Sequence, residues 1–524
     1  MLGSVPVPFL YGAIKFPVRA GPATSRIALV CGFSWALLNF APVNGIADSI
    51  DSPTASSQQQ VPQPAPVPVV PPATPAAPPE PQQIELYDVD AMAARMPANK
   101  DYYQKLRNDL LALYLSHHPT SSPYDDQARE VLRLAAYDMT WGDFYREGVM
   151  QDITLFAQTA QHNGCNDPMI TDLHDLGWLN TRNPNVPIAE ARAVEIGNKM
   201  ITAAQRPSPA ALRLWETETG LLATLRSNAN AQNPPPASKQ LVPKLIPLLE
   251  QALAELIKNK APGSILYGQV GDIFDPCQSS ESTLDLFSAA VDQAYNETGT
   301  ASGLRLAFDG DYYICAAWVA RGSDVASTVN NQQWQLFGQR LQQARQILES
   351  AYAQYPDEPA ISDLMLVVAL GGFDRDTMEM WFQRAIKADP NDYTAYLNKA
   401  YYLQPRWYGS EDEVWKFGQE CAATKNWSYK IPIVLPINVE LVAESGDQNI
   451  FARDDVWQLV ASVYHKYLDL HPRCNRYRTD FLKDAYLGHH QDVVAEQFKI
   501  LGKNWDRNEL SLPEYRKIRA SLGP

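Results

Sequence analysis

Apolar residues recur every three to four positions along most of this chain, a spacing typical of amphipathic α-helices. The stretch NKDYYQKLRNDLLALYLSHHP shows the pattern clearly and stops at a proline. On a helix its apolar residues would share one face: Tyr103, Leu106, Leu110, Leu113 and Tyr114. We expect this face to lie on a core and the proline to end the helix.

The same pattern continues through the first half of the chain. Residues 186–229 read as two helices separated by RPSP, and residues 241–263 read as one helix before a Pro-Gly stop. Alternating apolar and polar positions, which would indicate strands, are short and rare. We therefore predict an all-α protein, in which residues 84–263 form a helical N-terminal region without a demonstrable repeat.

The second half, residues 264–524, does repeat. Pro356 and Pro390 are separated by the 34-residue period of the tetratricopeptide repeat. At matching distances before each proline lie the residues expected to interlock in the second helix of a unit: Ala344, Leu348, Ala351, then Met378, Phe382, Ala385. Because such helical pairs cannot bury their apolar faces alone, we expect tetratricopeptide-like α-α units stacked into a solenoid.

The unit that opens with DYTAYLNKAYYLQP has an unusual turn between its two helices, QPRWYGS at 404–410. Ser410 is suited to cap the second helix, with Glu413 at the capping-box position. Trp407 and Tyr408 lie on the turn itself. They could form an aromatic platform beside a binding groove, or they could fill the gap between consecutive helix pairs, and both interpretations stay open.

These segments resemble a family of bacterial proteins, the domain of unknown function 4034 family. DGDYYICAAWVARGSDVASTVNNQQWQLFGQRL and QPRWYGSEDEVWKFGQEC are similar to that family's AW-x-ARG helix and P-[KR]-W-x-GS turn. The similarity is strongest over residues 309–421. Val319 departs from it, because a polar or acidic residue is expected inside AW-x-ARG. The resemblance implies a helical, repeat-like, often exported protein, and it implies no established activity.

The AWVARG helix carries the first candidate binding site. Tyr313 and Trp318 precede Arg321 by eight and three residues, so the three side chains share one helical face. A guanidinium beside such rings can present a fork of donors to a ligand carboxylate or carbonyl. It could instead pair within the protein, with Asp309, Asp311 or helix-end carbonyls, and join two helix pairs.

A second candidate binding site lies on the first helix after Pro390, which carries Tyr396, Asn398 and Lys399. First helices of a solenoid line its concave surface, which usually holds an extended peptide or a partner element. We expect at least one of the three side chains to face that surface. Asn and Lys can hydrogen-bond a peptide backbone or carboxylate without demanding one particular sequence.

The N-terminus reads as a targeting segment. Residues 1–47 contain no Asp or Glu and include the apolar run RIALVCGFSWALLNFAPV. This pattern is typical of a signal peptide cleaved between Ala47 and Asp48, with an uncleaved membrane anchor as the alternative. Residues 48–83 are proline-rich, which favours a disordered, extended linker. We expect an exported protein of the periplasm or cell envelope, free or tethered to the membrane.

Composition narrows the classes of partner and chemistry. The net charge is −15 with no basic cluster, so nucleic acid is not expected as a partner. No metal-binding or cofactor motif occurs, and the adjacent histidine pairs 117–118 and 489–490 make poor chelates, so we predict no metal and no cofactor. Five cysteines follow the leader with scattered spacing that specifies no disulfide framework: Cys165, Cys277, Cys315, Cys421 and Cys474.

Taken from the sequence, the best-supported function is an exported helical-repeat scaffold or adaptor that binds a protein or peptide, with no catalytic residue assigned. The rival is an envelope enzyme, a glycan or peptide hydrolase built on a helical scaffold, whose acid/base carboxylates would converge only in the fold. Inward carboxylates with shifted pKa values would favour the enzyme. A groove of aromatic, Asn and Arg side chains would favour binding.

Overall fold

A computed structural model describes most of the chain beyond residue 98. The described residues are 99–141, 146–180, 188–227, 237–274, 280–322, 328–372, 374–425, 427, 430–445, 447, 449–472, 474–506 and 509–523. The predicted leader (1–47), its cleavage point at Ala47 and Asp48, and the predicted linker (48–83) lie outside them. In the described part, no helix combines the length and the apolar character needed to cross a membrane.

All regular structure in the described residues is helical, with twenty α-helices, four short 3₁₀ helices and no strand. The all-α prediction is confirmed. The first α-helices are α2 (Lys100–His117), α3 (Asp125–Trp141), α4 (Arg146–His162), α5 (Pro168–Asn180), α6 (Glu190–Ala204), α7 (Ala210–Arg226), α8 (Val242–Lys258), α9 (Gly263–Val270) and α10 (Glu281–Thr298).

The second half of the described chain continues in the same way. Its α-helices are α11 (Gly303–Arg321), α12 (Asn331–Gln354), α13 (Pro359–Ala369), α14 (Arg375–Ala388), α15 (Tyr393–Tyr402), α16 (Glu411–Ala422), α17 (Val434–Ser445), α18 (Asp454–Leu470), α19 (Asn475–Leu487), α20 (Gln491–Leu501) and α21 (Leu512–Ser521). The 3₁₀ helices are η1 (Ala237–Leu241), η2 (Gly271–Ile273), η3 (Ile431–Ile433) and η4 (Ile450–Ala452).

Local sequence explains where several helices begin. Asn330 and Gln333 form a reciprocal capping box at the start of α12. Ser410 caps α16 as predicted, because its Oγ accepts the Glu413 backbone N–H at 3.3 Å. The Glu413 carboxylate accepts the Ser410 hydroxyl at 3.0 Å instead of closing a full capping box. The apolar face predicted for α2 also packs on the core, with four of its five residues buried.

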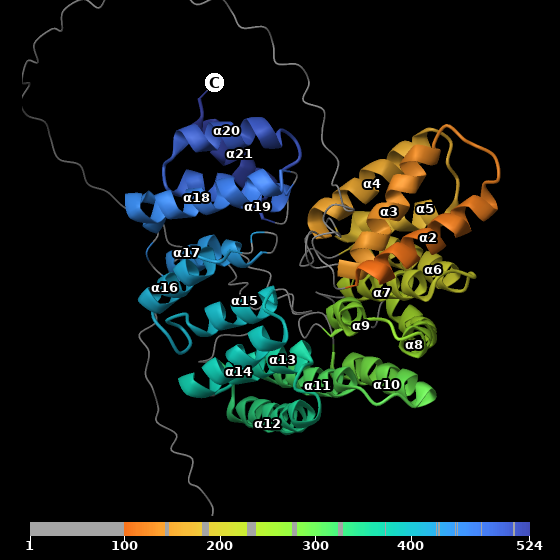
Figure 1. Ribbon diagram of the computed structural model, residues 1–524, viewed down its shortest axis with the longest axis horizontal. Helices are drawn as coiled ribbons and strands as arrows, with labels where there is room; N and C mark the ends of the chain where they lie inside the picture. The colour runs from red at the N-terminus through yellow and green to blue at the C-terminus, as the bar shows by residue number, and fades with distance from the viewer. Residues whose placement is uncertain are drawn as a thin grey trace, which may run out of the picture.

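The helices are arranged in a ring of two layers (Figure 1). Most consecutive helices pack side by side, and α13, α15 and α19 lie toward the middle while α12, α14 and α16 lie toward the rim. The last helices return to the first ones, since α19 packs on α4 and Asn475 Nδ2 donates to Gln151 Oε1 at 3.3 Å.

The two layers of the second half differ in what they bury. We call α11, α13, α15, α17 and α19 the inner helices. The outer helices α12, α14, α16 and α18 bury a stripe of apolar and aromatic residues. The inner helices also bury polar side chains: Asp311, Ser362, Asn398, Lys399, Asn438, Glu440, Arg478, Thr479, Asp480 and Asp484. Because a buried polar group destabilises a fold unless it is paired, these positions are the first place to look for function.

The residues aligned by the 34-residue spacing are core residues. Ala344, Leu348 and Ala351 on α12 are 0% exposed, and their counterparts on α14 are at most 4% exposed: Met378, Phe382 and Ala385. The proposed boundary at residue 263 falls between α8 and α9, and α8 packs on α10 across it. Four of the cysteines are buried in the described residues: Cys165, Cys315, Cys421 and Cys474.

Candidate functional site

The unusual turn between α15 and α16 is held close to the backbone that precedes it. A Cβ added at Gly409 would meet the Leu403 carbonyl oxygen at 2.1 Å, so only glycine fits without moving the turn. The Tyr408 N–H donates to the Tyr402 carbonyl at 3.2 Å. Gly409 and Ser410 therefore shape the turn, and the two aromatic residues before them are placed precisely by it.

The turn brings together the two motifs that carry the family resemblance. The rings of Trp318, at the end of α11, and Trp407 meet edge to face with centroids 6.5 Å apart. Trp318 also packs on Phe337 of α12 at 5.0 Å, and Trp407 packs on Tyr401 at 5.8 Å. The Trp407 Nε1 is a buried donor without a hydrogen-bond partner in the described structure. These contacts favour the interpretation of Trp407 as filling the gap between helix pairs.

Arg321 joins the same aromatic cluster. Its guanidinium carbon lies 5.5 Å from the Trp318 ring centroid and 5.3 Å from that of Trp334, and its Nη1 donates to the Gly322 carbonyl at 2.9 Å. Stacking on two rings and bonding a helix-end carbonyl describe an internal contact. Tyr313 lies about two turns earlier on α11 and packs on Tyr312 at 5.0 Å, so these contacts do not join Tyr313 to Arg321.

Replacing Trp318 and Trp407 by alanine, singly and together, should reveal a direct coupling of about 0.5–1.5 kcal/mol in the free energy of unfolding, the range for an edge-to-face aromatic pair. Denaturant unfolding of the four proteins measures it. Trp457→Ala is the control partner, because Trp457 packs on His490 and Phe481 in another part of the ring. The pair Trp407→Ala and Trp457→Ala should be additive; additivity of the Trp318 pair would contradict the packing.

The three side chains of the second predicted site, on α15, do not all point to the same side of the helix. Tyr396 packs on Phe382 of α14 at 5.2 Å and on Phe417 of α16 at 6.2 Å. Lys399 Nζ donates to Glu379 Oε2 at 2.7 Å and lies 4.3 Å from the Phe382 ring centroid. Tyr396 and Lys399 therefore point at the outer layer, which leaves Asn398 as the one of the three that could face the inner side.

Asn398 lies on the other side of α15, about 200° around the helix from Tyr396. Its side chain is 1% exposed. Of the three residues predicted on this helix, Asn398 is the one directed away from α14 and α16. Because it is buried, it offers no open surface to a ligand in this structure.

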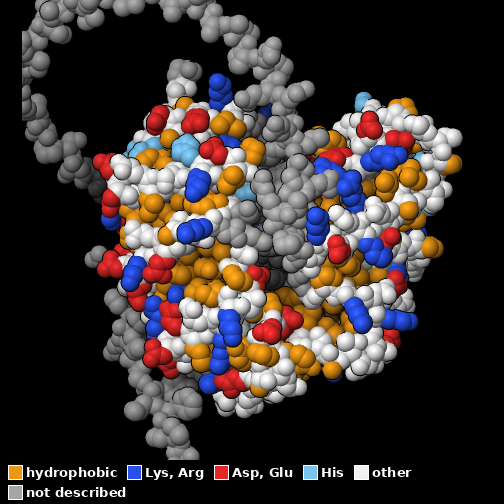
Figure 2. Space-filling view, in the orientation of Figure 1, with side chains coloured by type: hydrophobic (Ala, Val, Ile, Leu, Met, Phe, Trp, Pro, Cys, Tyr) orange, Lys and Arg blue, Asp and Glu red, His pale blue; other side chains and the backbone are white. Residues whose placement is uncertain are grey.

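Tyr408 differs from the other candidates because it is exposed. It is 45% exposed and is the one aromatic side chain among the large exposed apolar residues of the described chain. Its ring stacks on Tyr402 with centroids 4.7 Å apart, and its hydroxyl donates to the Leu370 carbonyl at 3.2 Å. Arg375 pairs with Glu379 within α14 (3.0 Å) and with Glu413 of α16 (2.7 Å). Figure 2 shows charged side chains along the rim formed by α14 and α16.

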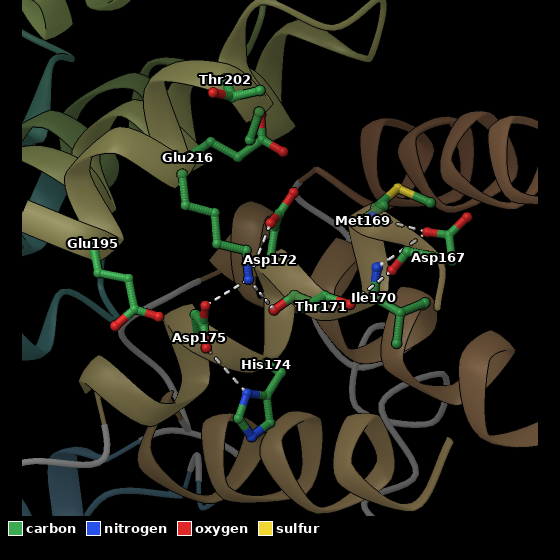
Figure 3. A network of polar contacts seen from close by, with 12 residues as sticks. Asp167, Met169, Ile170, Thr171, Asp172, His174, Asp175, Glu195, Thr202 and Glu216 are labelled. Carbon is green, nitrogen blue, oxygen red and sulfur yellow. Dashed lines mark hydrogen bonds and ion pairs between the residues drawn. The ribbon is translucent and has the colours of Figure 1, made fainter. Parts of the chain in front are cut away.

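The structure also contains a charged network that the sequence interpretation missed. Asp172 and Asp175 of α5 converge with Glu216 of α7, as Figure 3 shows. Lys199 of α6 donates to Asp175 Oδ2 at 2.5 Å and lies 3.4 Å from Asp172 Oδ1. Arg206 pairs with Asp172 and approaches Glu216 Oε1 to 3.9 Å. The network ties three helices together.

The surroundings of Glu216 and Asp175 shift the pKa values of these two carboxyl groups in opposite directions. Burial, reinforced by the charge of Asp172, raises the pKa of Glu216 to about 8. Burial acts in the same direction on Asp175, but hydrogen bonds from His174 and Lys199 outweigh it and hold the pKa of Asp175 below its usual range. Glu216 Oε2 and His174 Nε2 are buried and have no hydrogen-bond partner in the described structure.

A second buried acid lies on the inner helix α11. Asp311 is 3% exposed and accepts the Tyr267 hydroxyl at 3.0 Å. Burial raises its pKa to about 7, against the hydrogen bonds from Tyr267 and Cys315. The signal in the sequence was an acidic residue at an otherwise apolar helix position, as in LWETETG for Glu216 and FDGDYYICAAW for Asp311.

The histidine pair at 117–118 also has an unexpected partner. His118 Nε2 lies 3.0 Å and His117 Nδ1 lies 3.5 Å from Asp167 Oδ2. Asp167 in turn accepts the backbone N–H groups of Met169 and Ile170 at the start of α5. Across the described ranges, no group of three or more His, Cys, Asp or Glu side chains is arranged to hold a metal ion.

Comparisons with known proteins add no further evidence. The chain matches no family model, no curated protein and no solved structure. The resemblance to the domain of unknown function 4034 family therefore rests on the two motifs alone, and the contact between Trp318 and Trp407 gives both motifs a role in packing.

Proposed function

We propose that this protein is an exported, tetratricopeptide-like helical-repeat protein that binds a protein or peptide partner in the periplasm or cell envelope. Its support is the 34-residue spacing, whose aligned residues are buried at the interface between helices. The acid-free leader and its apolar run support export, with or without a membrane tether.

The observation that carries the binding proposal is the exposure of Tyr408. A tyrosine exposes a large rigid surface at low entropic cost, and residues of this type dominate the energetics of many interfaces. Stacking on Tyr402 and the hydrogen bond to Leu370 fix its ring before any partner arrives. The charged side chains of Arg375, Glu379 and Glu413 would then form a polar rim around an aromatic centre.

Charge indicates the kind of partner that this surface suits. The chain carries a net charge of −15, so its long-range field attracts basic partners and repels acidic ones. We therefore assign the surface around Tyr408 to a partner with an apolar pocket for the ring and basic groups at its edge.

A photo-reactive amino acid placed at position 408 should give a discrete cross-linked product in the native host. The same group placed at Leu286, which is 43% exposed on α10, is the matched control and should not give that product. In addition, Tyr408→Ala should abolish recovery of the cross-linked partner by the purified protein. The same products from both positions, or undiminished recovery by Tyr408→Ala, would contradict the proposal.

The second candidate function is an envelope hydrolase, and the divergent carboxyl groups of α5 and α7 favour it. A carboxyl group kept protonated near neutral pH, such as Glu216, can act as a general acid, and the same network holds an ionised carboxylate, Asp175. Hydrolysis of a glycan or peptide by the purified protein, abolished in Glu216→Gln while the fold persists, would replace the adaptor proposal by this one.

A further inference from the structure

Tyr408 presents one face of its ring to solvent. The other face stacks on Tyr402 with centroids 4.7 Å apart and ring planes inclined by 24°, and Tyr402 is only 1% exposed beneath it. The 45% exposure of Tyr408 therefore belongs to the opposite face and the edge of its ring. An aromatic face that is fixed and open to solvent can receive a flat apolar group or a cation.

The hydroxyl of Tyr408 places the ring at the carboxyl end of α13. It donates to the Leu370 carbonyl at 3.2 Å, and Leu370 directly follows the last residue of that helix. The carboxyl end of a helix carries a partial negative charge, which favours a cation nearby. The last turn of α13 contains no basic residue, so the helix does not supply that cation itself.

Two further helices begin close to this ring, and both begin with acidic residues. α14 starts shortly after Leu370 and α16 starts shortly after Tyr408, and the ion pair of Arg375 with Glu413 at 2.7 Å joins the two starts. The exposed carboxylates at these starts are Asp374, Asp376, Glu411 and Asp412. The surface beside the ring is therefore negatively charged.

The arginines near this surface are engaged elsewhere. Arg375 pairs with both Glu379 and Glu413. The guanidinium carbon of Arg406 lies 5.1 Å from the ring centroid of Tyr401. Within the described ranges, no cation lies over the ring of Tyr408. Its free face is thus open to a cation from another molecule.

We propose that the free face of Tyr408 receives an arginine side chain of the partner. The guanidinium plane stacks on the ring and directs its N–H groups toward the carboxylates that open α14 and α16. The inference rests on the proposed function, because it names the partner group that covers the ring at the binding surface. Arginine suits this surface better than lysine, since it is planar, weakly hydrated and donates several N–H groups in a fixed fork.

The hydrogen bond of the Tyr408 hydroxyl strengthens this recognition. Donation to the Leu370 carbonyl polarises the phenol and makes its ring more electron-rich, which increases the attraction for a cation. The same bond and the stacking on Tyr402 hold the ring in one position. Little conformational entropy is therefore lost at this residue when an arginine binds.

A fluorinated tyrosine placed at position 408 of the full chain tests the recognition, because its fluorine resonance reports on what binds to the ring. The probes are capped pentapeptides, Gly-Leu-X-Leu-Gly, in which X is arginine, lysine or citrulline. Citrulline has nearly the shape of arginine without its charge. The arginine peptide should shift the resonance at a concentration about fivefold lower than the citrulline peptide, with the lysine peptide between them.

Two pairs of substitutions separate the local charge from the net charge. Glu411→Gln with Asp412→Asn should raise the required concentration of the arginine peptide by about threefold to tenfold. Asp492→Asn with Glu496→Gln, at exposed positions of α20, changes the net charge equally and should leave this concentration unchanged. Thermal unfolding near the wild-type temperature shows that both proteins keep the fold.

Equal responses to the arginine and citrulline peptides, or equal weakening by the two pairs of substitutions, would overturn the inference. This test uses no native partner, so its failure is distinct from failure of the proposed function. A partner that cross-links at position 408 while the peptides show no preference for arginine would overturn the inference alone. Preference for the arginine peptide supports the inference even where no partner cross-links, a result that would contradict the proposed function.

Discussion

Replacement of Phe382 by alanine is expected to lower the free energy of unfolding by about 3–5 kcal/mol, the range for emptying a buried aromatic site. Phe382 is 4% exposed on α14. Its ring meets those of Tyr396 at 5.2 Å and Phe417 at 5.7 Å, so it contacts both helices of the following unit. Lys399 Nζ also lies 4.3 Å from its ring centroid and would lose that contact.

Met380 provides the matched control on the same helix. It is 41% exposed, so Met380→Ala removes little buried surface and should change the free energy of unfolding by no more than about 0.5 kcal/mol. Chemical denaturation of both variants measures the difference. Equal midpoints for Phe382→Ala and the wild-type protein would contradict the alignment of the 34-residue spacing as well as the packing.

The helices could be predicted because their signals are local. The apolar face of α2, the break at RPSP between α6 and α7, and the Ser410 cap each depend on residues within one or two turns. Local signals also favoured α12 and α14 as packed helices, since Leu348 and Phe382 occupy corresponding positions before a proline. Such spacing fixes which residues share a face, and burial of that face follows.

The contacts between distant segments could not be predicted in the same way. Trp318 and Trp407 are far apart in the sequence, and nothing in either motif states that their rings meet. The closure of the ring through Gln151 and Asn475 depends on the summed curvature of all the intervening helices. For Lys399, the sequence indicated the helix but not the direction of the side chain, because that direction depends on aromatic rings of α14 and α16 that lie beside the ammonium group.

The buried carboxyl groups were missed for a related reason. An Asp or Glu in a helix is usually solvated, so Glu216 and Asp484 look ordinary until the fold surrounds them. The apolar residues beside them in the sequence indicate that these carboxyl groups are buried, but they do not identify the side chains that the carboxyl groups contact. Which of the buried acids holds a proton depends on contacts such as the one between Lys483 and Glu440, which only the assembled helices create.

The second large effect is expected for Lys483→Met, which should destabilise the fold by about 3–5 kcal/mol at neutral pH, the range for removing one partner of a buried ion pair. Lys483 Nζ contacts Glu440 Oε1 at 3.0 Å. Burial disfavours the charged lysine, but the surrounding carboxylates Glu440, Asp480 and Asp484 outweigh it and raise the pKa of Lys483. Without the ammonium group, Glu440 would remain as a buried charge beside two further acids.

The pH dependence of this variant separates charge from packing. Methionine keeps most of the volume of the lysine stem, so the loss should come from unpaired carboxylates and should shrink toward about pH 5, where these groups bind protons more readily. Lys499→Met, at an exposed position on α20, is the control and should stay within about 0.5 kcal/mol of the wild-type protein at both pH values. A loss for Lys483→Met that is as large in acid as at neutral pH would show that the lysine stem, and not its charge, stabilises the contact between α19 and α17.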